Sequence, residues 1–325
     1  MTQSRRAALA LGASGLATLA LGPAARAQAG YPDRPVHISI GFAPGSGADI
    51  LSRYYAHKLE ELAKQPMIMD NKPGATGNIA LRYVARADPD GYNLLFSASS
   101  NMAGSRYLFK EPPVDTLNDF IPVASFAQIA FVLVVAHNSP VNSIAELIAK
   151  MKDKADNIAG YTNQTGQLST ELFKQITGAK VRLVSYKSTA DTMKDILDGT
   201  LDFIVLDGTF AAGQVRQGQL KALAVTTAKR SPTFPDTPTM QEAGVPGFEF
   251  APWWCVYAPA KTPQAIVDKL AGWMHQIAKD PDTPKFLESV GSILNDDTGP
   301  EADARLRAEL PTWERLVKSA GIEPQ

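Results

Sequence analysis

Cysteine and histidine are scarce in this chain of 325 residues, and their scarcity excludes two kinds of site. Cys255 is the single cysteine, so no disulfide can form within the chain, and its apolar neighbours favour a buried, unreactive thiol. The four histidines are scattered, without the spacing of a His-x-x-x-His motif. We therefore expect no metal site and a stability that comes from the hydrophobic core.

Neither sign of charge is in clear excess, because 32 basic residues face 33 acidic ones. A nearly neutral chain without a basic stripe argues against a nucleic acid as partner. The glycine-rich turn at 41–47 lacks the Lys-Ser/Thr pair of a Walker loop and the Gly-x-Gly-x-x-Gly spacing of a dinucleotide site. We therefore expect no cofactor, whether metal, nucleotide or redox group.

Long apolar runs are also missing, since none reaches the roughly 20 residues that a membrane span needs. The longest, from Ala7 to about Leu21, follows Arg5-Arg6 and precedes Ala25-Arg26-Ala27, the small-x-small pattern of a signal-peptidase site. Residues 1–27 are therefore expected to be a signal peptide, cleaved near Ala27 after export by the Sec or the twin-arginine route. The remaining protein is expected to be periplasmic.

Strands and helices are predicted to alternate along the chain. In the first unit, Val36, Ile38 and Ile40 have the two-residue period of a strand, and a helical apolar stripe begins after the turn at 41–47. The continuous apolar run Phe131–Ala136 is typical of a buried parallel strand. Repeated alternation predicts an α/β fold with mixed, mostly parallel sheets flanked by helices.

Polar loops follow several of the predicted strands, at 41–49, 98–101, 161–167 and 207–209. Ligands of such sheets bind where strands end and helices begin, and the free N–H groups of a helix start can hold a carboxylate or a phosphate. Asp49 would repel an anion beside it, so it would act through water or on a polar part of the ligand. The alternative is that these loops are ordinary connections.

Catalytic residues are not evident in these loops. Ser46 lies between two glycines and could imitate a nucleophile elbow, but no Gly-x-Ser-x-Gly motif is present and no base can be assigned to it. A periplasmic hydrolase with Ser46 as nucleophile therefore stays only as a remote alternative to a binding protein that is not an enzyme.

Several distinct sequence motifs are distributed along nearly the whole chain. They are Tyr31-Pro32-x-x-Pro35, Phe42-x-Pro44-Gly45-x-Gly47-x-Asp49, Asn71-Lys72-Pro73-Gly74-Ala75-x-Gly77-Asn78-Ile79, Pro89-Asp90-Gly91-Tyr92-x-Leu94-Leu95, Leu223-Ala224-Val225-Thr226, Glu242-Ala243-Gly244-Val245-Pro246-Gly247 and Ala258-Pro259-Ala260-x-Thr262-Pro263. With these motifs the chain resembles the Bug family, the periplasmic solute-binding proteins of tripartite tricarboxylate transporters.

The resemblance implies a two-lobed type II periplasmic binding protein that closes on a small ligand like a flytrap, here with residues 28–132 and 250–325 as one lobe and 133–249 as the other. It implies a monomer that holds a carboxylate through backbone N–H groups, hydroxyls and water, with Asp49 orienting water and ligand. Delivery to a two-component membrane permease would follow. The alternative output is signalling to a membrane sensor.

Departures from the family pattern concern the expected ligand. The loop at 161–167 is shorter than in the family, with Gln167 at the position of a family His, Asp207-Gly208 replaces an Asp-Asn pair, and Trp254-Cys255 is unusual. These changes would suit a bulkier or aromatic carboxylate, beside the dicarboxylic alternative. The expected ligand-binding residues are Phe42, Ala43, Ser46, Gly47, Asp49, Ala98, Ser99, Asn101, Thr162, Gln164, Thr165, Gln167 and Asp207.

Overall fold

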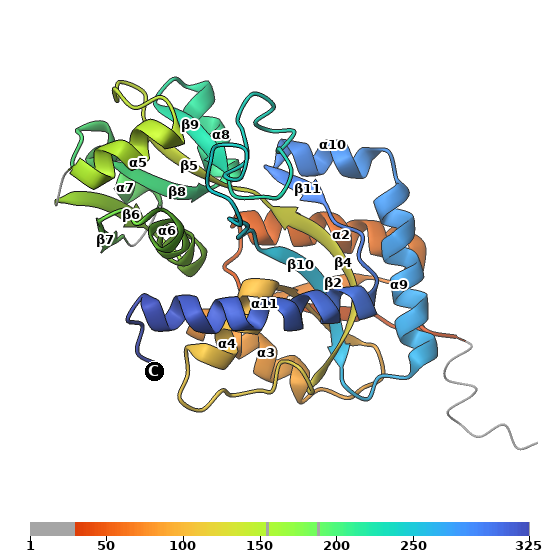
Figure 1. Ribbon diagram of the computed structural model, residues 1–325. Helices are drawn as coiled ribbons and strands as arrows, with labels where there is room; N and C mark the ends of the chain where they lie inside the picture. The colour runs from red at the N-terminus through yellow and green to blue at the C-terminus, as the bar shows by residue number, and fades with distance from the viewer. Residues whose placement is uncertain (1–29, 154–155, 187–188, 325) are drawn as a thin grey trace, which may run out of the picture.

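The computed structural model describes residues 30–153, 156–186 and 189–324, which form two β-sheets side by side, each covered by helices (Figure 1). The expected signal peptide, residues 1–27, lies outside the described residues. None of the helices in the described ranges is long and apolar enough to cross a membrane. The expected α/β class with two mixed, helix-flanked sheets is confirmed, but five of the nine strand pairings in the described ranges are antiparallel, so the sheets are not mostly parallel.

The larger sheet has six strands in the order β11-β4-β10-β3-β1-β2. Its first three strands along the chain are parallel, whereas β10 is antiparallel to both β3 and β4. The strands of this sheet are β1 (Val36–Ile40), β2 (Met67–Asn71), β3 (Asn93–Ala98), β4 (Phe120–Ile129), β10 (Trp253–Pro259) and β11 (Ser292–Leu294).

The smaller sheet has five strands in the order β7-β6-β8-β5-β9. They are β5 (Phe131–Ala136), β6 (Asn157–Tyr161), β7 (Val181–Ser185), β8 (Phe203–Asp207) and β9 (Leu220–Val225). The chain passes from the larger to the smaller sheet at Ala130, between β4 and β5. Phe131 and Val132 therefore pair with β8 of the smaller sheet and do not belong to the larger one. The division into two lobes that move as units remains a prediction.

The run 131–136 is buried as expected, but the prediction of a parallel strand is wrong. β5 is antiparallel to both of its neighbours, β8 and β9. The physical reason is that β5 enters the smaller sheet directly from β4, so it runs against the strands that reach this sheet through helical crossovers. Its apolar run reflects coverage of both sheet faces, which strand direction does not determine.

The helices follow the strands in the expected alternation. Those of the larger half are α2 (Gly47–Ala63), α3 (Asn78–Ala85) with the short η1 (Ala75–Gly77) before it, α4 (Ser99–Tyr107), α9 (Gln264–Lys279), α10 (Asp282–Ser289) and α11 (Gly299–Ser319). Those of the smaller half are α5 (Ile144–Asp153), α6 (Gln164–Thr177), α7 (Thr189–Leu197) and α8 (Gly208–Arg216).

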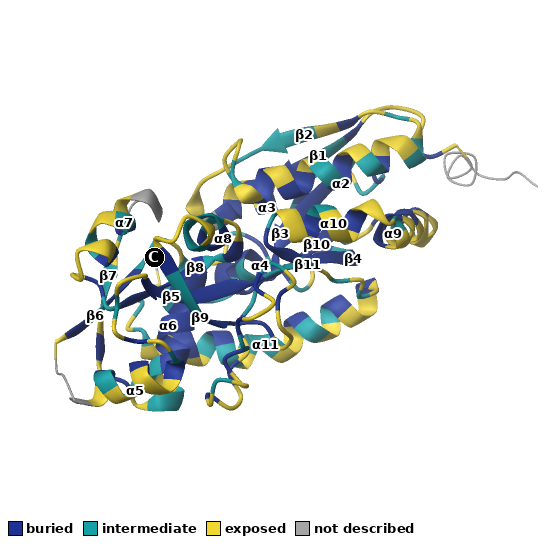
Figure 2. Cartoon of the chain, turned by 90° about the horizontal axis from the view of Figure 1, so that it is seen from above, coloured by how far each residue is buried: buried dark blue, intermediate teal, exposed yellow. Residues whose placement is uncertain are grey.

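β10 shows how the sequence builds the core on both faces of the larger sheet. Trp254 and Val256 belong to the apolar cluster beneath α2 and α9, whereas Trp253 and Cys255 belong to the cluster beneath α4 and α11. This alternation is the two-residue period of a strand buried on both faces. Figure 2 shows the central strands as largely buried between helices with exposed outer faces, whereas the edge strand β2 is mostly intermediate in burial.

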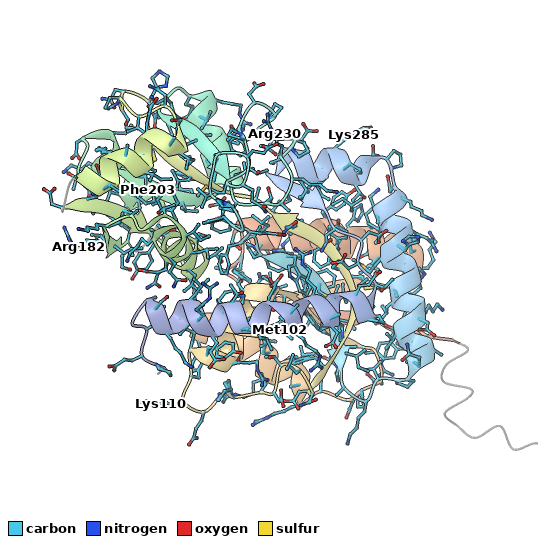
Figure 3. The ribbon with its side chains drawn as sticks, viewed as in Figure 1. Met102, Lys110, Arg182, Phe203, Arg230 and Lys285 are labelled. Carbon is cyan, nitrogen blue, oxygen red and sulfur yellow. The ribbon has the colours of Figure 1, made fainter. Side chains whose placement is uncertain are left out.

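The second of these clusters continues into the smaller half, so the two halves share a core. α11 contacts α4 and β4 in the larger half and α6 in the smaller half. Met102 beneath α11 and Phe203 in β8 both belong to this cluster and are fully buried, while the four Lys and Arg side chains labelled in Figure 3 lie at the periphery. α11 therefore links the two sheets.

Several elements differ from the sequence prediction, among them two of the expected polar loops. The expected polar loop at 98–101 is the end of β3 and the first turn of α4, and the expected loop at 161–167 contains the start of α6. Both segments are rich in Ser, Thr, Asn and Gln, which signal a loop locally, but packing against α11 and β8 favours the helices.

Candidate functional site

A cavity of about 410 Å³ lies between the two sheets, at the ends of several strands. Five helices begin at its wall, because the N-cap residues of α2, α3, α4, α6 and α8 all line it. The lining residues are Gly41, Phe42, Ser46, Gly47, Ala48, Gly74, Gly77, Ala98, Ser100, Asn101, Ile129, Phe131, Asn163, Gln164, Thr165, Asp207, Thr209, Pro252, Trp254, Val290 and Ser292.

The five helix starts differ in how they are capped. Ser46, Asn163 and Asp207 each accept a backbone N–H of their own helix through a side-chain oxygen. By contrast, no side chain caps α4 at Ala98 or α3 at Gly77. Each helix start carries about half a positive charge, and an uncapped first turn presents its N–H groups to whatever lies in front of it. The cavity wall therefore favours an anion, most directly at α3 and α4.

Ionisable side chains contribute little to the lining of this cavity. Asp207 is the one acidic or basic residue among the lining residues that the structure describes. Burial raises the pKa of its carboxyl group, although the N–H groups at the start of α8 act in the opposite direction. An anion in this cavity would thus be held by backbone N–H groups and neutral polar side chains, without a Lys or Arg.

Asp49 lies behind the cavity wall, where its hydrogen bonds hold the loop that precedes α2 in place. Its carboxylate accepts hydrogen bonds from Gly45 N, Arg53 Nε and Asn71 Nδ2, each at 2.9 Å. The residue is 3% exposed and does not line the cavity. Burial alone would raise the pKa of Asp49, but these donors together hold it below its ordinary value.

Asp49→Asn is expected to destabilise the protein by about 1–3 kcal/mol at neutral pH, because charge-assisted hydrogen bonds are lost. The lowered pKa means that Asp49 stabilises the fold fully above the unfolded value of about 4, and progressively less as the pH falls through the folded value. Urea unfolding measured from pH 7 to pH 2.5 should therefore show that the difference in free energy of unfolding between wild type and variant becomes smaller at acid pH. A difference that does not change with pH would contradict this role.

The cavity brings together eight of the thirteen residues expected from the sequence: Phe42, Ser46, Gly47, Ala98, Asn101, Gln164, Thr165 and Asp207. Ser99 lines a neighbouring pocket, while Ala43, Asp49, Thr162 and Gln167 line neither. The sequence reasoning missed Asn163, Thr209 and an apolar side of the cavity that includes Phe131 and Trp254. The N-cap position of α6 was a usable signal for Asn163, whereas Thr209 lies in the first turn of α8, after its N-cap Asp207.

The hydroxyl of Ser46 is engaged within its own loop. Its Oγ donates to the carbonyl oxygen of Ala43 at 2.7 Å and accepts from Asp49 N at 3.2 Å. A nucleophilic serine needs instead a base that accepts its proton. This arrangement makes Ser46 a helix cap. In the described ranges, no three His, Cys, Asp or Glu residues are grouped so that they could hold a metal ion.

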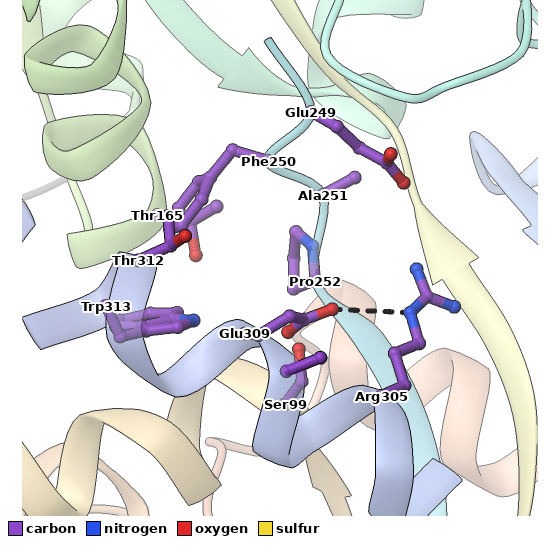
Figure 4. Close-up of a pocket in the computed structure, with 11 residues that line it drawn as sticks. Ser99, Thr165, Glu249, Phe250, Ala251, Pro252, Arg305, Glu309, Thr312 and Trp313 are labelled. Carbon is purple, nitrogen blue, oxygen red and sulfur yellow. Dashed lines mark hydrogen bonds and ion pairs between the residues drawn. The ribbon is translucent and has the colours of Figure 1, made fainter. Parts of the chain in front are cut away.

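A second pocket, of about 310 Å³, lies between α11 and the segment that leads into β10 (Figure 4). Glu309 is its central polar group and accepts from Trp253 Nε1 at 2.9 Å and from Arg305 Nε at 3.3 Å. Burial raises the pKa of Glu309. Glu249 lines the same pocket, and Arg305 also pairs with Asp297 at 3.4 Å. Because Glu309 and Asp297 already pair with the Arg305 guanidinium, this pocket is unsuited to a carboxylate ligand.

Comparison with known proteins places the chain in a family. The sequence profile of the tripartite tricarboxylate transporter family receptor matches residues 51–321. Protein BugT of Bordetella pertussis is 30% identical over 297 residues, which cover 90% of this chain and 91% of BugT.

Solved structures of similar proteins agree with this assignment. Rpa4515 of R. palustris, solved with adipate, has a TM-score of 0.79 and 33% identity, with 91% of this chain and all of that chain covered. MatC from Rhodopseudomonas palustris, solved with bound malate, has a TM-score of 0.74 and 25% identity, with 88% of this chain and all of that chain covered. The protein thus belongs to the receptor family of the tripartite tricarboxylate transporters, as the Bug-family motifs predict.

Proposed function

We propose that this protein is an extracytoplasmic receptor that captures a small carboxylate in the 410 Å³ cavity and delivers it to the two-component permease of a tripartite tricarboxylate transporter. The observation that carries the proposal is the convergence of five helix starts on one cavity, with no cationic side chain among the lining residues that the structure describes. The adipate and malate bound to similar proteins support the same ligand class.

The carboxylate would lie against the uncapped start of α4, with the starts of α2 and α3 beside it. Ser100 and Asn101 belong to the first turn of α4, and Ser46 and Gly47 begin α2. Residues of the smaller half, among them Asn163, Gln164 and Thr165 at the start of α6, would close over the rest of the ligand. Several hydrogen bonds to one charged group, each contributing about 1.5–3 kcal/mol, give such a site its affinity.

A thermal-shift screen of the protein purified from the periplasm tests the ligand class. The panel contains linear, branched and aromatic mono-, di- and tricarboxylates, with the matching carboxamides as controls. A ligand at 100 times its dissociation constant should stabilise the protein by about 2.7 kcal/mol. We expect one or more acids, and none of the amides, to raise the melting temperature. Hits from neutral or cationic compounds alone would refute the proposal.

Asp207→Asn is expected to strengthen the binding of the best carboxylate by about tenfold at a pH where the wild-type Asp207 carboxyl group is ionised, the effect of removing about 1.4 kcal/mol of repulsion. Asparagine keeps the cap of α8, so the fold is retained. Because burial raises the pKa of Asp207, affinity in the wild type should fall as the pH rises and this carboxyl group ionises. Calorimetric titrations from pH 5 to pH 8 measure both effects. Weaker binding in the variant would show that the Asp207 carboxylate itself binds the ligand.

A further inference from the structure

The indole of Trp254 lies where the apolar side of the cavity meets the start of α4. Trp254 pairs in the sheet with Ala98, the N-cap residue of α4, and both belong to the apolar cluster beneath α2. Its ring lies 5.2 Å from the ring of Phe42, centroid to centroid, and both residues line the cavity. This tryptophan is therefore next to the part of the wall that favours an anion.

Trp254 carries a buried hydrogen-bond donor that no group in the described ranges accepts. The residue is 1% exposed, and its Nε1 has no hydrogen-bond partner there. Trp253, its neighbour in the same strand, shows the usual outcome, because its Nε1 donates to Glu309 at 2.9 Å. A buried donor without an acceptor is unfavourable. Because Trp254 is a residue that lines the cavity, its unpaired donor points to an acceptor supplied by a ligand.

The rest of this wall is apolar. Phe42 and Trp254 are joined by Phe131, Ile129 and Val290, all of which line the cavity. A linear dicarboxylate would place methylene groups and a second charge against these side chains, whereas an aromatic ring would pack on them with little loss of conformational entropy. The wall thus favours a planar apolar body attached to a single carboxylate.

We propose that Trp254 determines specificity in this receptor: its indole N–H donates to an oxygen of the ligand carboxylate, and its ring, with Phe42, packs on an aromatic body. The preferred ligands are then arenecarboxylates of the benzoate type rather than linear diacids of the adipate type. This inference rests on the proposed carboxylate-binding function and names the ligand class within it.

Calorimetric titrations of the wild-type protein with benzoate, cyclohexanecarboxylate and adipate test the ligand class without any substitution. We expect benzoate to bind at least tenfold more tightly than adipate, and cyclohexanecarboxylate to lie between them. Adipate binding as tightly as benzoate would overturn this inference but leave the carboxylate receptor intact. If no acid of the wider panel binds, the proposed function fails, and this inference fails with it.

Two variants separate the donor from the ring. Trp254→Phe keeps an aromatic ring and removes the N–H, so the affinity for benzoate and for cyclohexanecarboxylate should fall about tenfold or more while their ratio is kept. Trp254→Leu should also reduce the preference for benzoate over cyclohexanecarboxylate.

Trp273→Phe is the matched control, since Trp273 lies on α9 and does not line the cavity. Benzoate should quench tryptophan fluorescence in the control but much less in Trp254→Phe. An unchanged benzoate affinity in Trp254→Phe would overturn the assignment.

Discussion

Gly77→Ala is expected to lower the free energy of unfolding by about 2–4 kcal/mol and to weaken ligand binding at least tenfold. Gly77 has a φ of +84°, which costs an L-residue about 1–2 kcal/mol. A Cβ at this position would also lie 2.4 Å from Nδ2 of Asn101, a buried residue that lines the cavity. The added methyl group therefore displaces the end of the Asn101 side chain, which alters the cavity and adds a packing cost to the backbone strain. Urea unfolding and calorimetric titration measure the two effects.

Gly45→Ala is the matched control for this substitution. Gly45 has a similar φ of +77°, but a Cβ there would meet no heavy atom within 4 Å. The control measures the backbone strain alone, so the excess effect of Gly77→Ala reports the displacement of Asn101. Equal losses of stability and unchanged binding in both variants would show that Asn101 has no role in the site.

Gly291→Ala is expected to have an even larger effect, because its methyl group would meet backbone on the opposite side of the cavity. Gly291 has a φ of +66°, and a Cβ there would lie 2.6 Å from Thr209 N and 2.7 Å from the carbonyl carbon of Gly208. These backbone atoms begin α8 and cannot rotate away, since Gly208 N is hydrogen-bonded to Ala130 O at 2.8 Å. The start of α8 must therefore move away from the segment between α10 and β11.

That movement should break the hydrogen bond from Thr209 Oγ1 to the carbonyl oxygen of Val290, which joins the two halves beside the cavity. We expect unfolding to become easier by about 3 kcal/mol or more, and carboxylate affinity to fall well over tenfold. Gly321→Ala controls for the backbone strain, because Gly321 has a φ of +63° and open space around it. If both variants bind the ligand as the wild type does, the contact between α8 and residue 291 has no role in shaping the site.

The part of the site that could be predicted from the sequence is the part with strong local signals. The strand at 36–40 has a clear two-residue period, and the helix after it has a side-chain cap in Ser46, whose Oγ accepts from Asp49 N. The structure has both elements, β1 and α2, at these positions. Local periodicity was sufficient there because the strand and the helix follow one another directly along the chain.

The remaining part depends on contacts between distant segments. Residues 99–107 have no apolar stripe of their own, and they form α4 because α11, about 200 residues further along the chain, packs on them. Asp49 was expected at the ligand, yet its three donors place it behind the wall. The first outcome is decided by a partner that only the assembled fold brings together. The second depends on Asn71, 22 residues along the chain, together with the local donors Gly45 and Arg53.

The most direct test of a carboxylate held by helix starts is a matched pair of titrations. The best acid from the screen and its primary amide have nearly the same shape, but only the acid carries the charge that the starts of α2, α3 and α4 favour. We predict that calorimetry at pH 7 finds the acid binding at least 100-fold more tightly than the amide. An amide that binds as tightly as its acid would contradict the account, because the cavity would then recognise shape and not charge.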